Sequence, residues 1–565
     1  MKIYTGRFFT HMRITVTYGF LSLVLSIGIL PSFSHSQINT ETLIDSSEPE
    51  NFTFELKLKD ERPSSLAGLE NEKPKSKLTP TIGLSFRKKG ISREDFQINL
   101  YRDSLQIDSV YVDTVTNTVK IVKDTVNIYK PWESRPHFWN SLWQMGFVEY
   151  FPFFMAKYVR DWGSTPEQIN WTKVSWDTWR RNLRDGFEYD GDNFLTNYFA
   201  HPYHGNLFYN AGRTNGYNFW ESSIYAFVGS GLWEMFGETF RPSFNDLITT
   251  TVNGINFGET MFKLSAMMTD NQATGFERTW REVVGGIINP VRGVTRLISG
   301  ESWRIFPNPD YARPESFKVK VYAGMRRLDN SSEGGGEIFS KGQEQGIYGL
   351  DVVYGDVFDY DMPFSYFTFG TELNSGSPQF GRLYSNGHIF GITLKDKKDV
   401  KHKLNFTLDY SYANNPGYQY GQTSVIPNLM SKYKFLWGTE LLTQVGLNAV
   451  IMGGTNTDYF VAADGRDYDL GPGLGVLANF ELRKNNWAFV KLMYTNGWIF
   501  SMTEPQDSKH NLNYVTLEIN IPLQKYFAVG LIASVYWRYS FYDGSPDVTK
   551  QVPIAKLYFS TLLDY

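Results

Sequence analysis

Apolar and polar side chains alternate along the chain from Phe317 to Tyr565, and this alternation constrains the fold more than any other feature. Over residues 404–412, Leu, Phe, Leu, Tyr and Tyr take alternate positions, and Asn, Thr, Asp and Ser take the positions between them. A period of two indicates β-strands, whose successive side chains point to opposite faces. Runs of about ten such residues suit tilted strands that cross a bilayer, with apolar side chains in lipid and polar ones in a lumen.

The connections between the predicted strands favour an antiparallel barrel. From the fifth strand onward, long connections alternate with very short ones at 437–439, 484–486 and 524–526. Outer-membrane barrels have short turns on the periplasmic side and long loops outside. Tyr565 ends the last strand on an aromatic residue, as expected of a strand recognised by the barrel-assembly machinery. The twelve predicted strands are 317–326, 346–354, 364–373, 383–394, 403–412, 425–437, 441–451, 473–483, 487–496, 512–523, 527–539 and 555–565.

A soluble antiparallel barrel or sandwich would show the same alternation. Aromatic residues in the outward rows favour the membrane barrel, because aromatic girdles lie where strands leave the bilayer. These residues are Tyr410, Tyr412, Tyr494 and Trp537. The charged residues of the opposite rows are then predicted to face the lumen, namely Lys318, Lys320, Arg326, Asp409, Glu481, Arg483, Lys491, Glu518 and Arg538.

The first 36 residues have the organisation of a signal peptide. Basic residues precede an apolar stretch from Ile14 to Leu30, and small and polar residues follow it. An N-terminal membrane anchor is the alternative interpretation. Residues 37–130 are polar and lack Trp, so we expect an extended or disordered periplasmic segment.

Composition excludes several classes of protein. Lys and Arg number 55 against 59 Asp and Glu, so no basic surface points to nucleic acid as a partner. The absence of Cys excludes disulfides, thiolate metal sites, thiol nucleophiles and an acylated lipoprotein anchor. Past the first 30 positions there is no apolar run long enough for a bundle of transmembrane helices.

Residues 131–309 form a predicted helical module that is rich in aromatic residues. Ten of the fifteen Trp lie between Trp132 and Trp280, and the apolar residues take helical spacing. An aromatic helix with Trp139, Trp143, Phe147, Tyr150, Phe151, Phe153 and Phe154 is predicted to lie at the periplasmic membrane interface. We hypothesise that the module caps or partly plugs the barrel and touches lipid. The predicted helices are 138–160, 175–186, 205–212, 219–238, 257–268 and 277–298.

Together these features predict an α+β membrane protein, with a C-terminal antiparallel transmembrane β-barrel at residues 317–565 preceded by the helical module. Small residues in the module, at Gly254 and Gly258 and at Ser222, Ala226 and Ser230, are typical of closely packed helices.

Titratable residues of the module form a candidate catalytic set. Paired imidazole and carboxylate groups can act as general acid and base, or can bind a metal. Their spacing matches no strong metalloenzyme motif, so neither a metal site nor a cofactor is predicted. In the alternative interpretation, Pro202 starts a helix and the carboxylates pair with Arg213, Arg241 or Arg278. The candidate residues are His201, His204, Glu234, Glu238, Asp246 and Glu259.

Four short motifs follow one another along this module. A His-Pro segment at His201 is followed by a Trp-Glu helix at Trp233, a Ser-Phe-Asn-Asp-Leu segment at 243–247 and a Gly-Glu pair at Gly258. Over roughly residues 194–259 the chain therefore resembles a bacterial family called domain of unknown function 3943. That resemblance implies no activity.

Three classes of function are compatible with these features. The leading expectation is a non-enzymatic outer-membrane barrel with a periplasmic helical cap, acting in passage, envelope structure or assembly. The second is a lipid-active hydrolase or acyltransferase in which His201 or His204 is the base. The third is a surface-binding scaffold that uses the loops 329–345 and 453–471. Outer-membrane lipid is the expected partner, and a small molecule or a lipid is a possible ligand.

Overall fold

The computed structural model describes residues 129–154, 171–189, 191–329, 342–359, 362–459, 466–484, 487–503 and 507–564, together with the backbone of five short earlier strands. The chain divides into two compact units, 1–127 and 128–565. In the first unit, β1 (Glu55–Leu58), β2 (Thr81–Phe86) and β3 (Glu94–Asn99) form an antiparallel sheet, and β4 (Val110–Asp113) pairs with β5 (Thr118–Ile121). The predicted signal peptide lies outside the described residues, as does Tyr565.

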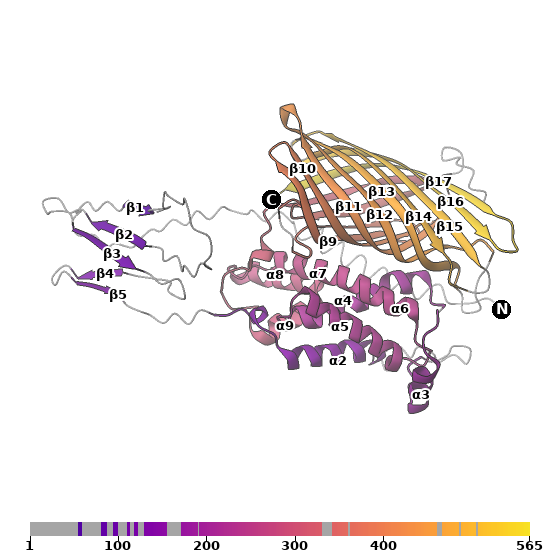
Figure 1. Ribbon diagram of the computed structural model, residues 1–565, viewed down its shortest axis with the longest axis horizontal. Helices are drawn as coiled ribbons and strands as arrows, with labels where there is room; N and C mark the ends of the chain where they lie inside the picture. Colours follow the sequence, from indigo (N-terminus) through magenta and orange to yellow (C-terminus); the bar gives the residue numbers. More distant parts are fainter. Residues whose placement is uncertain are drawn as a thin grey trace, which may run out of the picture. The chain divides into compact units, whose positions relative to one another are not determined.

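A closed antiparallel barrel of twelve strands forms the C-terminal half of the second unit (Figure 1), so the predicted barrel is confirmed. Most strands are longer than predicted, because residues assigned to the long connections extend them into the loops. The strands are β6 (Phe317–Leu328), β7 (Gln343–Tyr354), β8 (Phe367–Asn374), β9 (Phe380–Lys397), β10 (Val400–Asn414), β11 (Gln419–Lys434), β12 (Thr439–Asn456), β13 (Tyr468–Lys484), β14 (Trp487–Phe500), β15 (Ser508–Pro522), β16 (Phe527–Tyr542) and β17 (Val548–Asp564).

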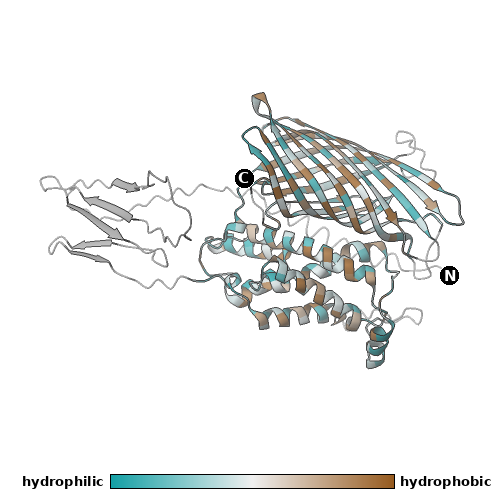
Figure 2. Cartoon of the chain, in the orientation of Figure 1, coloured by the Kyte–Doolittle hydropathy of each residue, from teal (hydrophilic) through white to brown (hydrophobic). Residues whose placement is uncertain are grey.

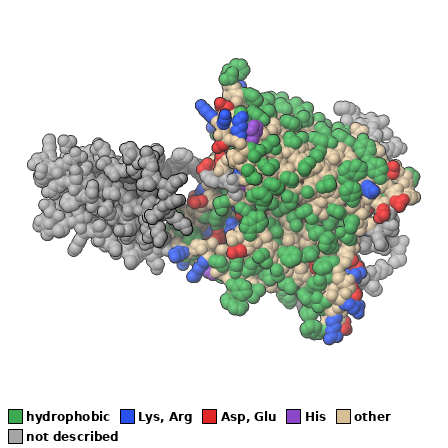
Figure 3. Space-filling view, in the orientation of Figure 1, with side chains coloured by type: hydrophobic (Ala, Val, Ile, Leu, Met, Phe, Trp, Pro, Cys, Tyr) green, Lys and Arg blue, Asp and Glu red, His purple; other side chains and the backbone are tan. Residues whose placement is uncertain are grey.

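The outward face of the barrel is apolar, as a membrane-spanning wall requires. Figure 2 shows hydrophobic residues along the strands, and Figure 3 shows apolar side chains covering this face of the barrel, with charged ones at the hairpin between β9 and β10. Exposed side chains of this wall include Phe390, Ile392, Leu394, Val445, Leu447, Leu474, Val476, Phe480, Leu517, Leu531, Leu557 and Phe559.

Charged side chains of the opposite rows form ion pairs inside the barrel, which confirms the predicted lumen face. Lys320 on β6 lies 2.9 Å from Glu518 on β15 and 3.2 Å from Asp351 on β7. Lys556 on β17 lies 2.7 Å from Glu372 on β8. The pairs with Glu518 and Glu372 join strands that are not neighbours, and Lys320 and Asp351 lie on the adjacent strands β6 and β7, so the middle of the lumen contains a network of linked charges.

A layer of mainly apolar side chains lies in the lumen near the end where β10 turns into β11. Tyr418, in the turn between β10 and β11, stacks on Tyr536 of β16 with ring centroids 4.0 Å apart. The two residues come from nearly opposite sides of the barrel and are only 9% and 3% exposed. Around them pack Leu328, Ile499, Leu512, Val552 and Ile554, each almost completely buried.

The helical module precedes the barrel, and none of its described helices is long and apolar enough to cross a membrane by itself. Its helices are η1 (Trp132–Ser134), α2 (Phe138–Phe154), α3 (Trp176–Asp185), η3 (Thr196–Ala200), α4 (His201–Arg213), α5 (Phe219–Leu232), η4 (Trp233–Gly237), α6 (Phe244–Ile248), η5 (Thr249–Asn253), α7 (Gly254–Met268), α8 (Gly275–Ile288), α9 (Pro290–Ser299) and η6 (Asp310–Ala312).

Two predicted helices differ from the observed ones. The segment predicted as one helix over 277–298 is two, because Pro290 cannot continue α8 and Asn289 caps α9 by accepting a hydrogen bond from the Arg292 amide at 3.0 Å. The segment predicted over 219–238 leaves α-geometry at Trp233, passes through the π-helical turn η4 and ends at Gly237.

The module packs against the outer wall of the barrel, so the hypothesis that it caps or plugs the barrel mouth is wrong. Asn256 of α7 donates hydrogen bonds to the carbonyl oxygens of Ser385 and Leu408, and Thr260 lies 2.9 Å from the outward-facing Ser385 hydroxyl. Tyr410 and Tyr412, predicted for a lipid-facing girdle, are buried beneath the module instead. An outward aromatic row is equally suited to lipid and to a packed helix.

Glycines make room for this contact. The ring of Tyr198, on η3, lies over Gly421 of β11 and Gly454 of β12, where an added Cβ would come within 2.4 Å and 2.6 Å of the ring. The Tyr410 hydroxyl donates a hydrogen bond to the Tyr198 carbonyl at 2.5 Å.

The contact extends from one end of the covered strands to the other. At the end where β7 turns into β8, Tyr354 donates a hydrogen bond to the Tyr311 carbonyl at 2.7 Å. At the opposite end, where β13 begins, Asn197 donates a hydrogen bond to the Tyr468 hydroxyl at 2.5 Å. Figure 1 shows the helices lying along the side of the barrel between these two ends.

The interior of the module is unusually polar. Asn289 donates a hydrogen bond to Asn210 at 2.7 Å, and Asn215 donates one to Gln144 at 2.7 Å. Arg296 pairs with Glu282 at 2.8 Å within the same core. The outer faces of α2 and α5 are apolar, with Trp139, Leu142, Trp143, Phe147, Phe151, Trp220, Ile224, Phe227 and Val228 exposed. A polar interior with an apolar exterior is the reverse of a soluble helical domain.

Candidate functional site

Three of the six predicted site residues converge at one end of the module. His201 is the first residue of α4, Glu234 lies in η4, and Asp246 lies in α6. Each is next to or within a π-helical turn, since η3 ends at Ala200, η4 contains Glu234, and η5 follows α6 directly. Such turns often occur at functional sites because the extra residue per turn redirects side chains.

The side chains of these three residues form one compact group, which we call the His201 cluster. A ring nitrogen of His201, a carboxylate oxygen of Glu234 and a carboxylate oxygen of Asp246 all lie within 4.8 Å of one another. His201 Nε2 is 3.4 Å from Asp246 Oδ1 and 3.6 Å from Oδ2 of a fourth residue, Asp192.

Hydrogen bonds from neighbouring residues hold the carboxylates in place. The Ser243 amide donates to Glu234 Oε2 at 2.8 Å, and the Asn245 side-chain amide donates to Asp246 Oδ1 at 3.0 Å. Burial, with added repulsion from Glu238 and Asp246, raises the pKa of Glu234 well above its ordinary value.

Asp192 was not predicted as a site residue. It lies in the short irregular segment 191–193 before the helix that leads to His201, and spacing along the chain does not single it out. Its side chain is half exposed, whereas those of His201 and Asp246 are 13% and 2% exposed, so solvent reaches the cluster from the side of Asp192. The Asp192 carbonyl also accepts a hydrogen bond from the Tyr468 hydroxyl at 2.9 Å, which places the cluster near the end of the barrel where β13 begins.

The predicted helix over 219–238 would place Glu238 four residues after Glu234 on the same helix face, but in the structure the two do not share a face. The helix ends at Gly237, where an added Cβ would come within 2.8 Å of the Trp233 ring, and Glu238 is already in extended conformation. Its charge still acts on Glu234.

Glu259 belongs to a separate buried pair. Arg213 Nε lies 2.8 Å from Glu259 Oε2, and the Tyr209 hydroxyl donates to the same oxygen at 2.7 Å. This is the predicted pairing with Arg213. Arg241 instead pairs with Glu188, outside the His201 cluster.

His204 lies one turn after His201 in α4, between aromatic rings. Its ring centroid is 4.4 Å from that of Phe208 and 4.8 Å from that of Trp233. Burial, reinforced by the nearby His201, lowers the pKa of His204 to about 3. His204 is therefore neutral in the folded protein and is not suited to be a base at neutral pH.

The low pKa of His204 predicts acid sensitivity of the module. In the unfolded chain the imidazole binds a proton below about pH 6.5, while the folded protein takes it up only near pH 3. The unfolded state therefore gains protons as the pH falls through this window, and stability decreases by at most ~1.4 kcal/mol per pH unit. We expect His204→Phe to reduce this loss, measured as the pH dependence of unfolding followed by Trp fluorescence in detergent micelles. His402→Gln, in the barrel, should leave the dependence unchanged, and an unaltered slope in His204→Phe would contradict the assignment.

The chemistry open to the His201 cluster is proton transfer or cation binding. Ser243 Oγ donates to Asn245 Oδ1 at 2.9 Å and caps α6 by accepting from the Asp246 amide, so this hydroxyl has a structural role. The Ser222 hydroxyl donates to the Asn218 carbonyl within α5. Neither serine is placed as a nucleophile for His201.

Comparisons with known proteins agree with the sequence-based resemblance. Residues 186–291 match the family described as Domain of unknown function (DUF3943). The matched segment runs from the end of α3 to the start of α9 and contains the whole His201 cluster. No curated protein sequence matches the chain.

Solved structures similar to the chain are outer-membrane proteins. An anion-selective porin from Comamonas acidovorans is 8% identical, with 44% of this chain and 100% of that chain covered and a TM-score of 0.17. The channel DcaP of Acinetobacter baumannii is 8% identical, with 44% and 96% covered and a TM-score of 0.19. OprD from Pseudomonas aeruginosa is 9% identical, with 45% and 94% covered and a TM-score of 0.18. TM-scores this low give no information about transport. The barrel is established by its own strand pairing.

Proposed function

We propose that this chain is an outer-membrane protein of the bacterial envelope, in which a closed barrel anchors a helical module that lies beside it in contact with lipid. The observation that carries this proposal is the placement of the module along the outward face of the barrel wall, the face that lipid otherwise covers. The role is structural and non-enzymatic.

The inverted polarity of the module supports lipid contact. In a bilayer, helices associate through small residues and hydrogen bonds between polar side chains, and ionised groups face the interior of the bundle. Gly205 and Gly254 meet backbone to backbone, and the buried Arg292 pairs with Glu133 at 3.2 Å. The exposed aromatic residues of α2 and α5 then continue the apolar surface of the barrel.

The obstructed lumen favours a role as an anchor for the module over a role in the passage of solutes. The stacked Tyr418 and Tyr536 rings and the residues around them block the path beside the charge network. Apolar constrictions also exclude water and ions. The wild-type barrel is therefore expected to conduct poorly.

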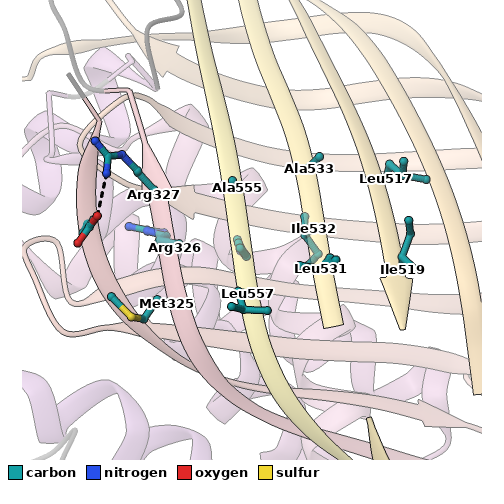
Figure 4. A pocket seen from close by; sticks show the side chains of 12 residues that line it. Met325, Arg326, Arg327, Leu517, Ile519, Leu531, Ile532, Ala533, Ala555 and Leu557 are labelled. Atoms are coloured by element: carbon teal, nitrogen blue, oxygen red, sulfur yellow. Dashed lines mark hydrogen bonds and ion pairs between the residues drawn. The ribbon is translucent and has the colours of Figure 1, made fainter. Parts of the chain in front are cut away.

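A groove on the uncovered part of the wall offers a second lipid contact. It has a volume of about 470 Å³ and lies on the outward side of β15, β16, β17 and β6. Figure 4 shows the small Ala533 and Ala555 among larger apolar side chains, with Arg327 at one edge, 2.8 Å from Glu344. Its shape and chemistry suit an acyl chain.

Single cysteines test the lipid contact, because the chain has no Cys of its own. We expect a fluorophore at Phe147→Cys on α2 or Phe227→Cys on α5 to be quenched at least about twofold by lipids that carry a quencher on the acyl chain. Both positions are more than half exposed. The measurement is steady-state fluorescence of the full chain in vesicles.

Two further labels serve as controls. A label at Leu447→Cys, on the outward face of β12, reports that the barrel is inserted, and one at Arg184→Cys, on the polar helix α3, reports a site in water. If the α2 and α5 labels match the α3 label while the barrel label is quenched, the module lies outside the lipid and the proposal is wrong.

The convergence of His201, Glu234 and Asp246 favours one second candidate, a lipid-active enzyme. The cluster belongs to the module that we propose contacts lipid, and His201 with Asp246 beside it has the arrangement of a general base and its orienting group. Substitution of His201 that alters membrane lipid composition without altering folding would favour the enzyme. Unchanged lipid composition would favour the anchor.

A further inference from the structure

We propose that the His201 cluster binds one divalent transition-metal ion through His201, Glu234 and Asp246, with Asp192 beside the site on its solvent-facing side. The proposal is independent of the lipid contact argued above, because it concerns the solvent-reachable end of the module.

The spacing of the ligand atoms fits a metal better than a direct hydrogen bond. Charged N–H···O hydrogen bonds are about 2.7–2.9 Å long, whereas His201 Nε2 lies 3.4 Å from Asp246 and 3.6 Å from Asp192. Around a metal with ligands at about 2.0–2.2 Å, two tetrahedral ligand atoms lie roughly 3.3–3.6 Å apart. The imidazole nitrogen of His201 and the nearest oxygen of Asp246 therefore lie at the separation that a shared ion produces, and Glu234 lies within reach of the same ion.

The charge of the cluster also calls for a cation. Glu234 and Asp246 are both about 1% exposed, and Asp192 and Glu238 add further negative charge nearby. Buried carboxylates are normally paired or bound to metal, because removing an ion from water costs several kcal/mol. His201 by itself can supply a single positive charge.

The groups around the ligands resemble those that orient metal ligands elsewhere. The Ser243 amide and the Asn245 side chain fix the two buried carboxylates through one hydrogen bond each. Such supporting hydrogen bonds set the direction of a ligand and tune the metal. The half-exposed Asp192 leaves an entry path for the ion.

One imidazole with several carboxylates selects a class of metal. Imidazole suits Zn²⁺ and similar first-row ions, while an all-oxygen set would suit Mg²⁺ or Ca²⁺. We therefore expect Zn²⁺ or Mn²⁺ to bind more tightly than Mg²⁺ or Ca²⁺.

Calorimetric titration of the chelator-treated full-length protein in micelles tests the proposal, with Zn²⁺ and Mn²⁺ as probes. We expect one ion per chain and a higher thermal unfolding midpoint, followed through the Trp fluorescence of the protein. Asp192→Asn should weaken binding at least about tenfold, and His201→Gln should abolish it.

A matched variant separates the site from general binding to surface acids. Glu277→Gln removes an exposed carboxylate of the same module, on α8, and should leave affinity unchanged. Asp192 is half exposed, so Asp192→Asn is expected to fold even if substitution of the more buried His201 is not tolerated. Absence of stoichiometric binding, or equal affinity in Asp192→Asn and wild type, overturns the proposal.

Discussion

Replacing both stacked rings, Tyr418→Ala with Tyr536→Ala, is expected to turn a barrel with little conductance into one that passes ions. The two rings lie 4.0 Å apart across the lumen and pack against apolar neighbours that are almost completely buried. In the middle of the lumen the lining side chains are charged, as in the Lys320–Glu518 pair, and such groups are readily hydrated. Removal of the rings therefore opens a wetted path, and we expect ion current in planar bilayers to rise at least about tenfold.

The control for this experiment lies on the same strand. Tyr539 of β16 points outward and is 42% exposed, so Tyr539→Ala changes the same residue type without touching the lumen. It should conduct no better than wild type. Large currents through the wild-type protein would contradict the closed lumen, and so would a folded double variant that conducts no more than Tyr539→Ala.

Gly205→Leu is expected to destabilise the helical module by ~3 kcal/mol or more. A Cβ at Gly205 of α4 would lie 1.8 Å from the Thr250 carbonyl oxygen and 2.9 Å from the Cα of Gly254. Both neighbours are backbone atoms, so no side chain can rotate away, and α4 must separate from η5 and α7. The same shift would disturb the His201 cluster, because His201 begins α4.

Urea unfolding in micelles, followed by Trp fluorescence, measures this effect, since most Trp residues lie in the module. Gly231→Ala on α5 is the matched control. An added Cβ there meets nothing within 4 Å, so the change should be neutral or stabilising by up to ~1 kcal/mol. The barrel of Gly205→Leu should keep its closed strand pairing. A stability equal to that of wild type would show that the helices do not pack this closely.

Much of the fold could be read from local pattern. All twelve strands were predicted in order, because a wall with a polar lumen and an apolar exterior imposes a period of two on each strand. The close packing at Gly254 was likewise expected from small residues at helical spacing. The break between α8 and α9 is signalled by Pro290. The predicted helix runs through it because the helical spacing of the apolar residues continues across the break.

The candidate site was only partly predictable. His201, Glu234 and Asp246 were among six candidates, and the crossing of α4, η4 and α6 brings these three together while leaving Glu259 with Arg213. Helix crossings depend on packing between distant segments, which spacing along the chain does not encode. Asp192 lies against His201 for the same reason, and the irregular segment that contains it has no motif of its own.

A membrane-type barrel and an aromatic helical module follow from the residue pattern, because strand and helix periods are local properties. The folded chain is needed to show that the module lies along the outer wall, that Tyr418 meets Tyr536 across the lumen, and that Asp192 faces His201. Each of these depends on which apolar or charged surfaces meet after folding. The alternation of apolar and polar residues predicts that the Tyr410 side chain points outward from the barrel. It does not predict whether lipid or a helix of the module covers that side chain.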